Sequence, residues 1–113
     1  MTNFAHGREA EAQAAHYLND QGFTIIAQNW RTRFCEIDII AQKKKTMFFI
    51  EVKYRVNELQ GTGLEYITPK KLGQMKFAAE FWVQEHDWRG DCSLAALEVS
   101  GPAYTITNFL TEI

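Results

Sequence analysis

Several features are scarce in this sequence of 113 residues, and their scarcity excludes whole classes of protein. It contains two prolines and no repeated or low-complexity segment, which argues against a disordered chain and a repeat protein. No apolar run is long enough for a signal peptide or a membrane span. We therefore predict one cytoplasmic domain covering residues 1–113, with no membrane partner.

Cysteine is equally scarce. The two cysteines, Cys35 and Cys92, fall in no CxxC or Cys/His pattern, so the sequence indicates neither a zinc site nor a disulfide framework. We predict that both are buried free thiols, since an isolated cysteine usually behaves as a small apolar residue.

The charged residues are unevenly distributed along the chain. The net charge is −2, yet residues 1–76 carry +3 and residues 77–113 carry −5. This asymmetry allows one cationic face toward an anionic partner. The asymmetry alone does not establish an anionic partner, because many solvated surfaces have an equally uneven distribution of charge.

The local patterns predict an α/β fold with a five-stranded mixed sheet flanked by helices, in the order α-β-β-β-α-β-β. An alanine-rich helix should end before Gly22, and Thr68 with Pro69 should begin a second helix. A loop is predicted at 57–63. The expected helices cover 6–20 and 68–86, and the expected strands cover 23–30, 33–42, 46–55, 93–99 and 103–109.

The third predicted strand carries charge where burial is expected. Because strand side chains alternate, Glu51 and Lys53 should share a face with Phe49. In the strand before it, Asp38 should point away from Ile37 and Ile39, which should share the opposite face. A tight turn makes the two strands neighbours, so we expect Asp38 and Glu51 to converge.

The first predicted helix adds a third carboxylate. Glu11 shares a helical stripe with Ala14, Ala15 and Leu18, so it should face inward, where an unpartnered charge is costly. A divalent cation would relieve this cost for Glu11, Asp38 and Glu51 together. Mg²⁺ or Mn²⁺ is the expected ion, because hard cations favour oxygen ligands.

This arrangement predicts metal-dependent hydrolysis of phosphodiesters, with Lys53 orienting the attacking water and balancing negative charge. The alternative is an ordinary ion pair between Glu51 and Lys53 on a half-exposed sheet, worth less than ~1 kcal/mol. The pattern of residues alone leaves both interpretations open.

The run "GREAEAQAAHYLNDQGFTIIAQNWRTRFCEIDIIA…FFIEVKYR" resembles the bacterial YraN family of predicted endonucleases, and "TPKKLGQMKFAAEFW" extends the similarity more loosely. The resemblance implies kinship with archaeal Holliday-junction resolvases, a restriction-endonuclease-like fold and the PD-(D/E)xK active site. It therefore implies an endonuclease that acts on nucleic acid. The expected substrate is DNA, which includes branched DNA. A homodimer is also implied, although no residue demonstrates an interface.

Carried over by position, the resemblance assigns the catalytic and metal-binding roles to Glu11, Asp38 and Glu51, with Lys53 as the catalytic lysine. Arg55 and Lys71 match basic residues suited to nucleic acid. This chain departs from the family pattern at three places, which leaves its handling of substrate open. Cys35 and Ala10 stand where the family has glycine, and "SLA" at 93–95 replaces the family's Arg-Phe-Asp.

Arg31 and Arg33 are further candidates for binding nucleic acid, because they follow Trp30, which would stack on a base. The alternative is a plain hairpin turn with solvated arginines. For the protein as a whole, the alternatives to an endonuclease are a nucleic-acid-binding module without turnover and a scaffold whose carboxylates are satisfied by ion pairs.

Overall fold

The computed structural model describes residues 3–56 and 65–113 and has the predicted order of elements. The loop predicted at 57–63 lies outside the described residues. The helices are α1 (Asn3–Asp20) and α2 (Pro69–His86), and the strands are β1 (Thr24–Arg31), β2 (Glu36–Lys43), β3 (Thr46–Arg55), β4 (Asp91–Ser100) and β5 (Thr105–Leu110). None of the described helices is long and apolar enough to cross a membrane.

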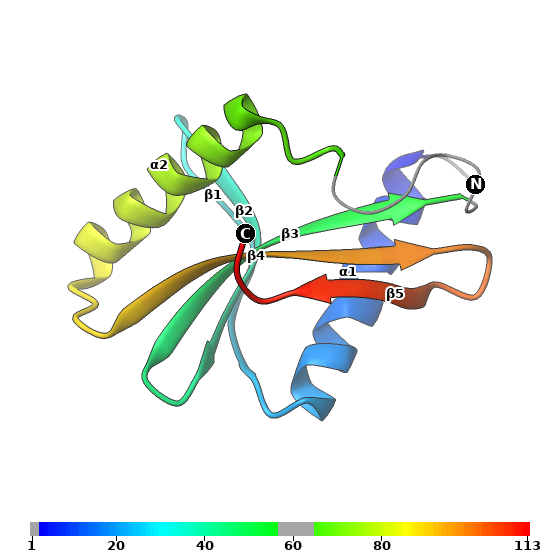
Figure 1. Ribbon diagram of the computed structural model, residues 1–113, viewed down its shortest axis with the longest axis horizontal. Coiled ribbons are helices and arrows are strands. Elements are labelled where there is room, and N and C mark those ends of the chain that lie inside the picture. The colour runs from blue at the N-terminus through cyan, green and yellow to red at the C-terminus, as the bar shows by residue number, and fades with distance from the viewer. Residues whose placement is uncertain (1–2, 57–64) are drawn as a thin grey trace.

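The five strands form one mixed sheet in the order β1-β2-β3-β4-β5. Strands β3 and β4 are parallel and joined through α2, whereas the other neighbours are antiparallel. Figure 1 shows α1 and α2 on opposite sides of the sheet. The fold is thus the predicted α/β arrangement of a mixed sheet between two helices.

Each helix buries a small-residue stripe against one face of the sheet. Ala14 and Leu18 of α1 are fully buried beside Ile39 and Ile50, which confirms the inward stripe predicted for α1. On the other face, Trp82 of α2 packs against Phe49, with ring centroids 5.7 Å apart. Small residues let the helices approach closely, and the large side chains fill the remaining space.

The ends of α2 follow from local chemistry. The Thr68 side chain accepts a hydrogen bond from the Lys71 backbone N–H at 3.1 Å, and Pro69 begins the helix. Asp87 closes the helix with a φ of 50°, in the left-handed region. The Thr68 cap at the other end fixes the first turn of α2, and therefore Lys70 and Lys71, beside the sheet.

The sheet forks between β2 and β3. Their pairing ends at Ile39 opposite Ile50, although β1 still pairs with β2 as far as Glu36 and β4 with β3 as far as Arg55. Beyond Ile50 the two strands diverge, as Figure 1 shows. The fork leaves backbone groups free for side chains and opens a space that elements from both faces can reach.

Two local predictions were wrong. Ile39 packs against the α1 face, but Ile37 joins the cluster against α2. Pairing with β3 no longer constrains β2 at Ile37, because the fork begins there. Both cysteines are free, as predicted, but neither is fully buried. Cys35 is partly buried, and Cys92 is exposed because it lies at the N-terminal end of β4.

Candidate functional site

A cleft of about 610 Å³ occupies the fork of the sheet. It brings together the three predicted site carboxylates and the predicted catalytic lysine, which come from α1, β2 and β3. Its lining consists of His6, Gly7, Glu11, Asp38, Glu51, Val52, Lys53, Tyr54, Arg55 and Val56. The structure therefore brings these four charged residues to one cleft, and their roles there remain a prediction.

Asp38 is held at the point where the strands separate. Its Oδ2 accepts a hydrogen bond from the Val52 backbone N–H at 2.8 Å, a donor that the β2–β3 ladder leaves free. Burial, followed by the negative charge of Glu51, raises the pKa of Asp38 from 3.8 to about 7. Such a shift identifies a carboxyl group held in an unfavourable place, as is typical of functional sites.

Glu51 is the second carboxylate of the cleft, and like Asp38 it is half-buried. Its Oε2 lies 3.2 Å from the Lys71 Nζ, an ion pair that joins β3 to the first turn of α2. Burial raises the pKa of Glu51, and the Lys71 ammonium offsets part of this rise. The fold thus already accommodates a positive charge beside this carboxylate.

Glu11 reaches the cleft from α1. Burial and then the charge of Asp38 raise its pKa, while a hydrogen bond with the Asn29 side chain lowers it in part. Glu11 and Asp38 also line a second hollow of about 330 Å³, together with Asn29. Asn29 was not among the predicted site residues. The φ of Asn29 is 52°, a left-handed conformation that asparagine tolerates. No sequence motif predicts that its side chain meets Glu11.

The carboxylates of the cleft meet some, but not all, of the requirements of a divalent-cation site. In the described part of the chain, no group of three or more Asp, Glu, His or Cys side chains is arranged so that it could hold a metal ion. The predicted three-carboxylate cage is therefore not preformed. However, Mg²⁺ commonly uses only one or two carboxylates with water, and the repulsion between Asp38 and Glu51 is what a cation would relieve.

Tyr66 is a second residue beside the site that the sequence did not predict. Its ring lies beneath two cations, with Lys53 Nζ 5.9 Å and Arg55 Cζ 5.6 Å from the centroid. Its hydroxyl is buried and has no hydrogen-bond partner among the described residues. Burial and the nearby Glu98 and Glu51 raise the pKa of Tyr66, so the hydroxyl stays protonated and available as a donor.

Replacing Tyr66 with phenylalanine is expected to leave the free protein as stable as the wild type, or to stabilise it by about 1 kcal/mol. The substitution removes a buried hydroxyl that folding withdraws from water and that has no hydrogen-bond partner among the described residues. Urea denaturation of the Tyr66→Phe variant measures this difference. A loss of more than about 1 kcal/mol would show that the hydroxyl is bonded in the free protein.

The carboxyl groups of the cleft should make the metal-free protein less stable as the pH rises. The pKa of Asp38 is raised on folding, so the native state holds more protons than the unfolded chain between about pH 4 and 7. Stability is therefore lost across that window. Urea denaturation in EDTA should give a lower free energy of unfolding at pH 7.5 than at pH 5, with a smaller difference in Asp38→Asn. A rise in stability from pH 5 to 7.5 would contradict this account.

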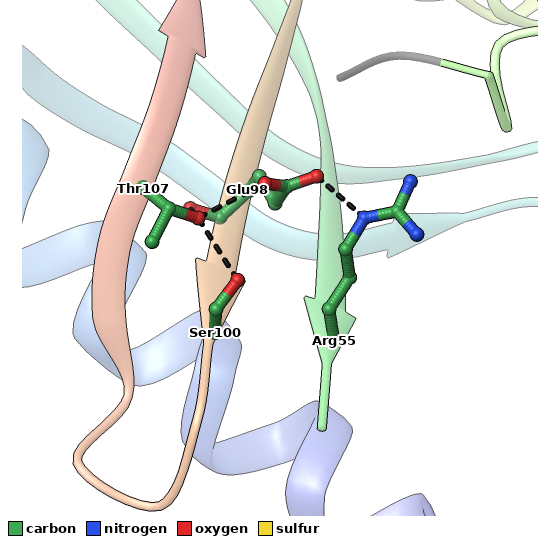
Figure 2. A network of polar contacts seen from close by, with 4 residues as sticks. All are labelled: Arg55, Glu98, Ser100 and Thr107. Carbon is green, nitrogen blue, oxygen red and sulfur yellow. Dashed lines mark hydrogen bonds and ion pairs between the residues drawn. The ribbon is translucent and has the colours of Figure 1, made fainter. Parts of the chain in front are cut away.

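Arg55 has a structural role that the sequence did not predict. The residue is only 7% exposed, and its Nε donates to Glu98 Oε2 at 2.6 Å. Thr107 donates to the other oxygen of Glu98 at 3.0 Å, and Ser100 lies 2.9 Å from the Thr107 hydroxyl. Figure 2 shows this network across β3, β4 and β5. Contact between Arg55 and nucleic acid remains a prediction.

Of the other predicted nucleic-acid contacts, Arg31 borders the hollow that Glu11 and Asp38 share. Arg31 and Arg33 are exposed at the β1–β2 turn, and Arg31 Nη2 lies 3.7 Å from Glu36 Oε2. Trp30 packs against neighbouring side chains rather than standing free in solvent. It is partly buried in the cluster beneath α2, 6.1 Å from the Phe81 ring. Lys71 contacts Glu51, as described above.

The fold and the cleft define an α/β protein with a forked mixed sheet and a carboxylate-lined site at the fork. Residues 10–99 match the model of the uncharacterised protein family UPF0102, and the chain belongs to this family, which is the YraN family that its sequence resembles.

Individual relatives are similar over most of their length. The chain is 39% identical over 95 residues to a UPF0102 protein of Nitrosomonas eutropha, covering 84% of this chain and 82% of that protein. It is 36% identical over 97 residues to one of Shewanella woodyi, covering 84% and 83%. It is 35% identical over 101 residues to one of Cytophaga hutchinsonii, covering 89% of each.

Proposed function

We propose that this protein is an endonuclease that hydrolyses phosphodiester bonds in DNA with the help of Mg²⁺ or Mn²⁺. One observation carries the proposal. Asp38 and Glu51 lie together in a cleft at the fork of the sheet, where burial and mutual repulsion raise the pKa of Asp38 to about 7. Burying two neighbouring carboxylates costs folding free energy, and such a cost is expected where the charges serve a reaction.

The residues of the cleft divide the work between them. Asp38 and Glu51 would hold the cation, and Glu11 would contribute through water. The cation would supply Lewis-acid stabilisation of a phosphate oxygen and lower the pKa of a water molecule. Lys53 is exposed at the same cleft, so its ammonium can orient the attacking water and balance the charge that develops on the phosphate.

The resemblance to the YraN family supports the same proposal independently of the electrostatics. It places the PD-(D/E)xK residues on Asp38, Glu51 and Lys53, and all three line the cleft. Branched DNA as the substrate, and a homodimer as the active form, follow only from the relation to resolvases. Both are therefore part of the proposal and rest on analogy.

Cleavage of a panel of labelled DNAs tests the proposal. Plasmid, single-stranded and four-way DNA are incubated with the wild type in Mn²⁺, Mg²⁺ or EDTA. We expect cleavage of at least one substrate in the presence of either cation and none in EDTA. If every DNA substrate stays intact when the folded protein is incubated with either metal, the proposed hydrolysis is overturned.

A second candidate is a nucleic-acid-binding module without turnover. It is favoured by the Glu51–Lys71 ion pair, which satisfies one carboxylate without a metal, and by the lack of a preformed three-ligand group among the described residues. Salt-dependent binding of DNA without any cutting would select this function.

A further inference from the structure

A groove of about 700 Å³ lies next to the cleft, between the β1–β2 turn and the first half of α2. From the turn it is lined by Arg31, Phe34 and Glu36, and from α2 by Lys71 and Phe77, among others. Arg31 and Glu36 also border the smaller hollow shared by Glu11 and Asp38. The groove is therefore continuous with the carboxylates of the candidate active site. Figure 1 shows the elements that form it.

The groove presents aromatic rings to solvent. Phe34 is 68% exposed and Phe77 is 52% exposed, although both are large apolar side chains. The partly buried Phe81 lies between them, with its ring centroid 6.5 Å from Phe34 and 6.3 Å from Phe77. Phe81 thus anchors two exposed rings to the core. Exposed aromatic faces on a fixed support are what stacking on unpaired bases requires.

Cations surround these rings. Arg31, Lys70 and Lys71 line the groove with a single acidic residue, Glu36. Arg33 adds a fourth cation, with its Cζ 5.4 Å from the centroid of the Phe34 ring. The combination of positive charge and flat apolar surface suits a phosphate backbone that carries unpaired bases.

A second copy of this chain is a poorer occupant. In a two-fold symmetric dimer the same patch lies on both partners, so these cations would face one another across the interface. Like charges brought together in this way oppose association. Duplex DNA would satisfy the cations, but its stacked bases would leave the Phe34 and Phe77 rings unused.

We propose that this groove binds an unpaired strand of nucleic acid, by stacking bases on Phe34 and Phe77 while Arg31, Arg33 and Lys70 contact its phosphates. The inference rests on the proposed function, since it names the substrate as a nucleic acid with a single-stranded part beside the cleavage site. It also replaces Trp30 with Phe34 as the aromatic residue of the turn that meets a base.

Binding in EDTA tests the groove separately from hydrolysis. Fluorescence anisotropy compares the wild type with Phe34→Ala, Phe77→Ala and the double variant, on three labelled probes. The probes are a 15-nucleotide oligothymidylate, an abasic oligomer with the same number of phosphates, and a duplex of the same length. Leu110→Ala is the matched control, because Leu110 is another exposed apolar side chain, on β5 and outside the groove.

We expect the double variant to bind oligothymidylate at least tenfold more weakly than the wild type, and the abasic oligomer and the duplex within about twofold. The Leu110→Ala variant should match the wild type on all three probes. Because the substituted side chains are exposed, thermal melting should confirm that every variant folds. Equal binding of oligothymidylate by the wild type and the double variant would overturn the inference. So would a wild-type dimer that dissociates in the double variant, which would make the groove an interface between copies.

The outcomes of this experiment and of the cleavage panel are distinguishable. Binding that depends on Phe34 and Phe77, without cleavage on any substrate, would support the groove while the proposed hydrolysis fails. Metal-dependent cleavage with unchanged binding by the double variant would support hydrolysis and overturn the groove.

Discussion

Replacing Asp38 with asparagine is expected to abolish metal-dependent cleavage of DNA and, at the same time, to stabilise the free protein at pH 8. Asparagine keeps the size of the side chain and an oxygen that can accept the Val52 N–H bond, so the fork of the sheet should be preserved. It removes the negative charge that a cation requires. We expect the cleavage rate to fall at least about a thousandfold, since a bound cation supplies several kcal/mol of charge stabilisation.

The gain in stability has the same origin as the loss of activity. Folding raises the pKa of Asp38 to about 7, so at pH 8 the wild type holds a carboxylate that is less favourable folded than unfolded. Removing this charge should stabilise the free protein by on the order of 4 kcal/mol, because folding raises the pKa by about three units and each unit corresponds to about 1.4 kcal/mol. Urea denaturation in EDTA at pH 8 measures the gain.

A matched control separates the site from a general effect of charge. Glu85 is an exposed carboxylate on α2, so Glu85→Gln removes one negative charge away from the cleft. It should change neither cleavage nor stability appreciably. An Asp38→Asn variant that still cleaves DNA at more than a tenth of the wild-type rate would exclude Asp38 as a metal ligand.

Replacing Glu98 with alanine should destabilise the protein by about 3–5 kcal/mol, because it removes the carboxylate that neutralises a buried guanidinium. Arg55 is 7% exposed and lies 2.6 Å from Glu98, so its charge cannot turn to solvent without disturbing β3. The Thr107 hydroxyl would also lose its bond to the carboxylate, although the Glu98 carbonyl oxygen and the Ser100 hydroxyl remain within reach. Urea denaturation at pH 7 measures the loss.

Two companion variants make this expectation specific. Thr107→Val removes one neutral donor from the network and should cost only about 1 kcal/mol. The double variant Arg55→Met with Glu98→Leu replaces both charges by apolar side chains, and it should recover most of the stability lost in Glu98→Ala. If Glu98→Ala unfolds within 1 kcal/mol of the wild type, the network does not hold β3, β4 and β5 together in the way described.

Local signals predicted the elements of this fold because each signal acts over a few residues. Thr68 and Pro69 set the start of α2 through a cap and a fixed φ, whatever the helix packs against. The alternation of Ile50 and Glu51 set the two faces of β3, and the small-residue stripe placed Glu11 inward. The meeting of Glu11, Asp38, Glu51 and Lys53 at one cleft followed from these local rules.

The contacts that the sequence did not predict all depend on how distant segments meet. Glu98 lies opposite Lys53 only because β4 pairs in parallel with β3, which brings it within reach of Arg55. Lys71 meets Glu51 only once α2 has docked on the sheet. Tyr66 belongs to no periodic pattern.

The position of Ile37 illustrates the same limit within one strand. Alternation predicted that it shares a face with Ile39, yet the pairing of β2 and β3 ends at Ile39. A rule for paired strands does not hold where the pairing stops, and that is where the candidate site lies. The fork of the sheet was therefore the feature hardest to predict and the one on which the cleft depends.

Anomalous diffraction from crystals soaked in MnCl₂ tests the central claim most directly. We expect one strong peak in the cleft, within about 2.5 Å of a carboxylate oxygen of Asp38 and of Glu51. The same soak of Asp38→Asn crystals should show no peak there. A wild-type cleft without a manganese peak, at concentrations that support cleavage of DNA, would contradict the account.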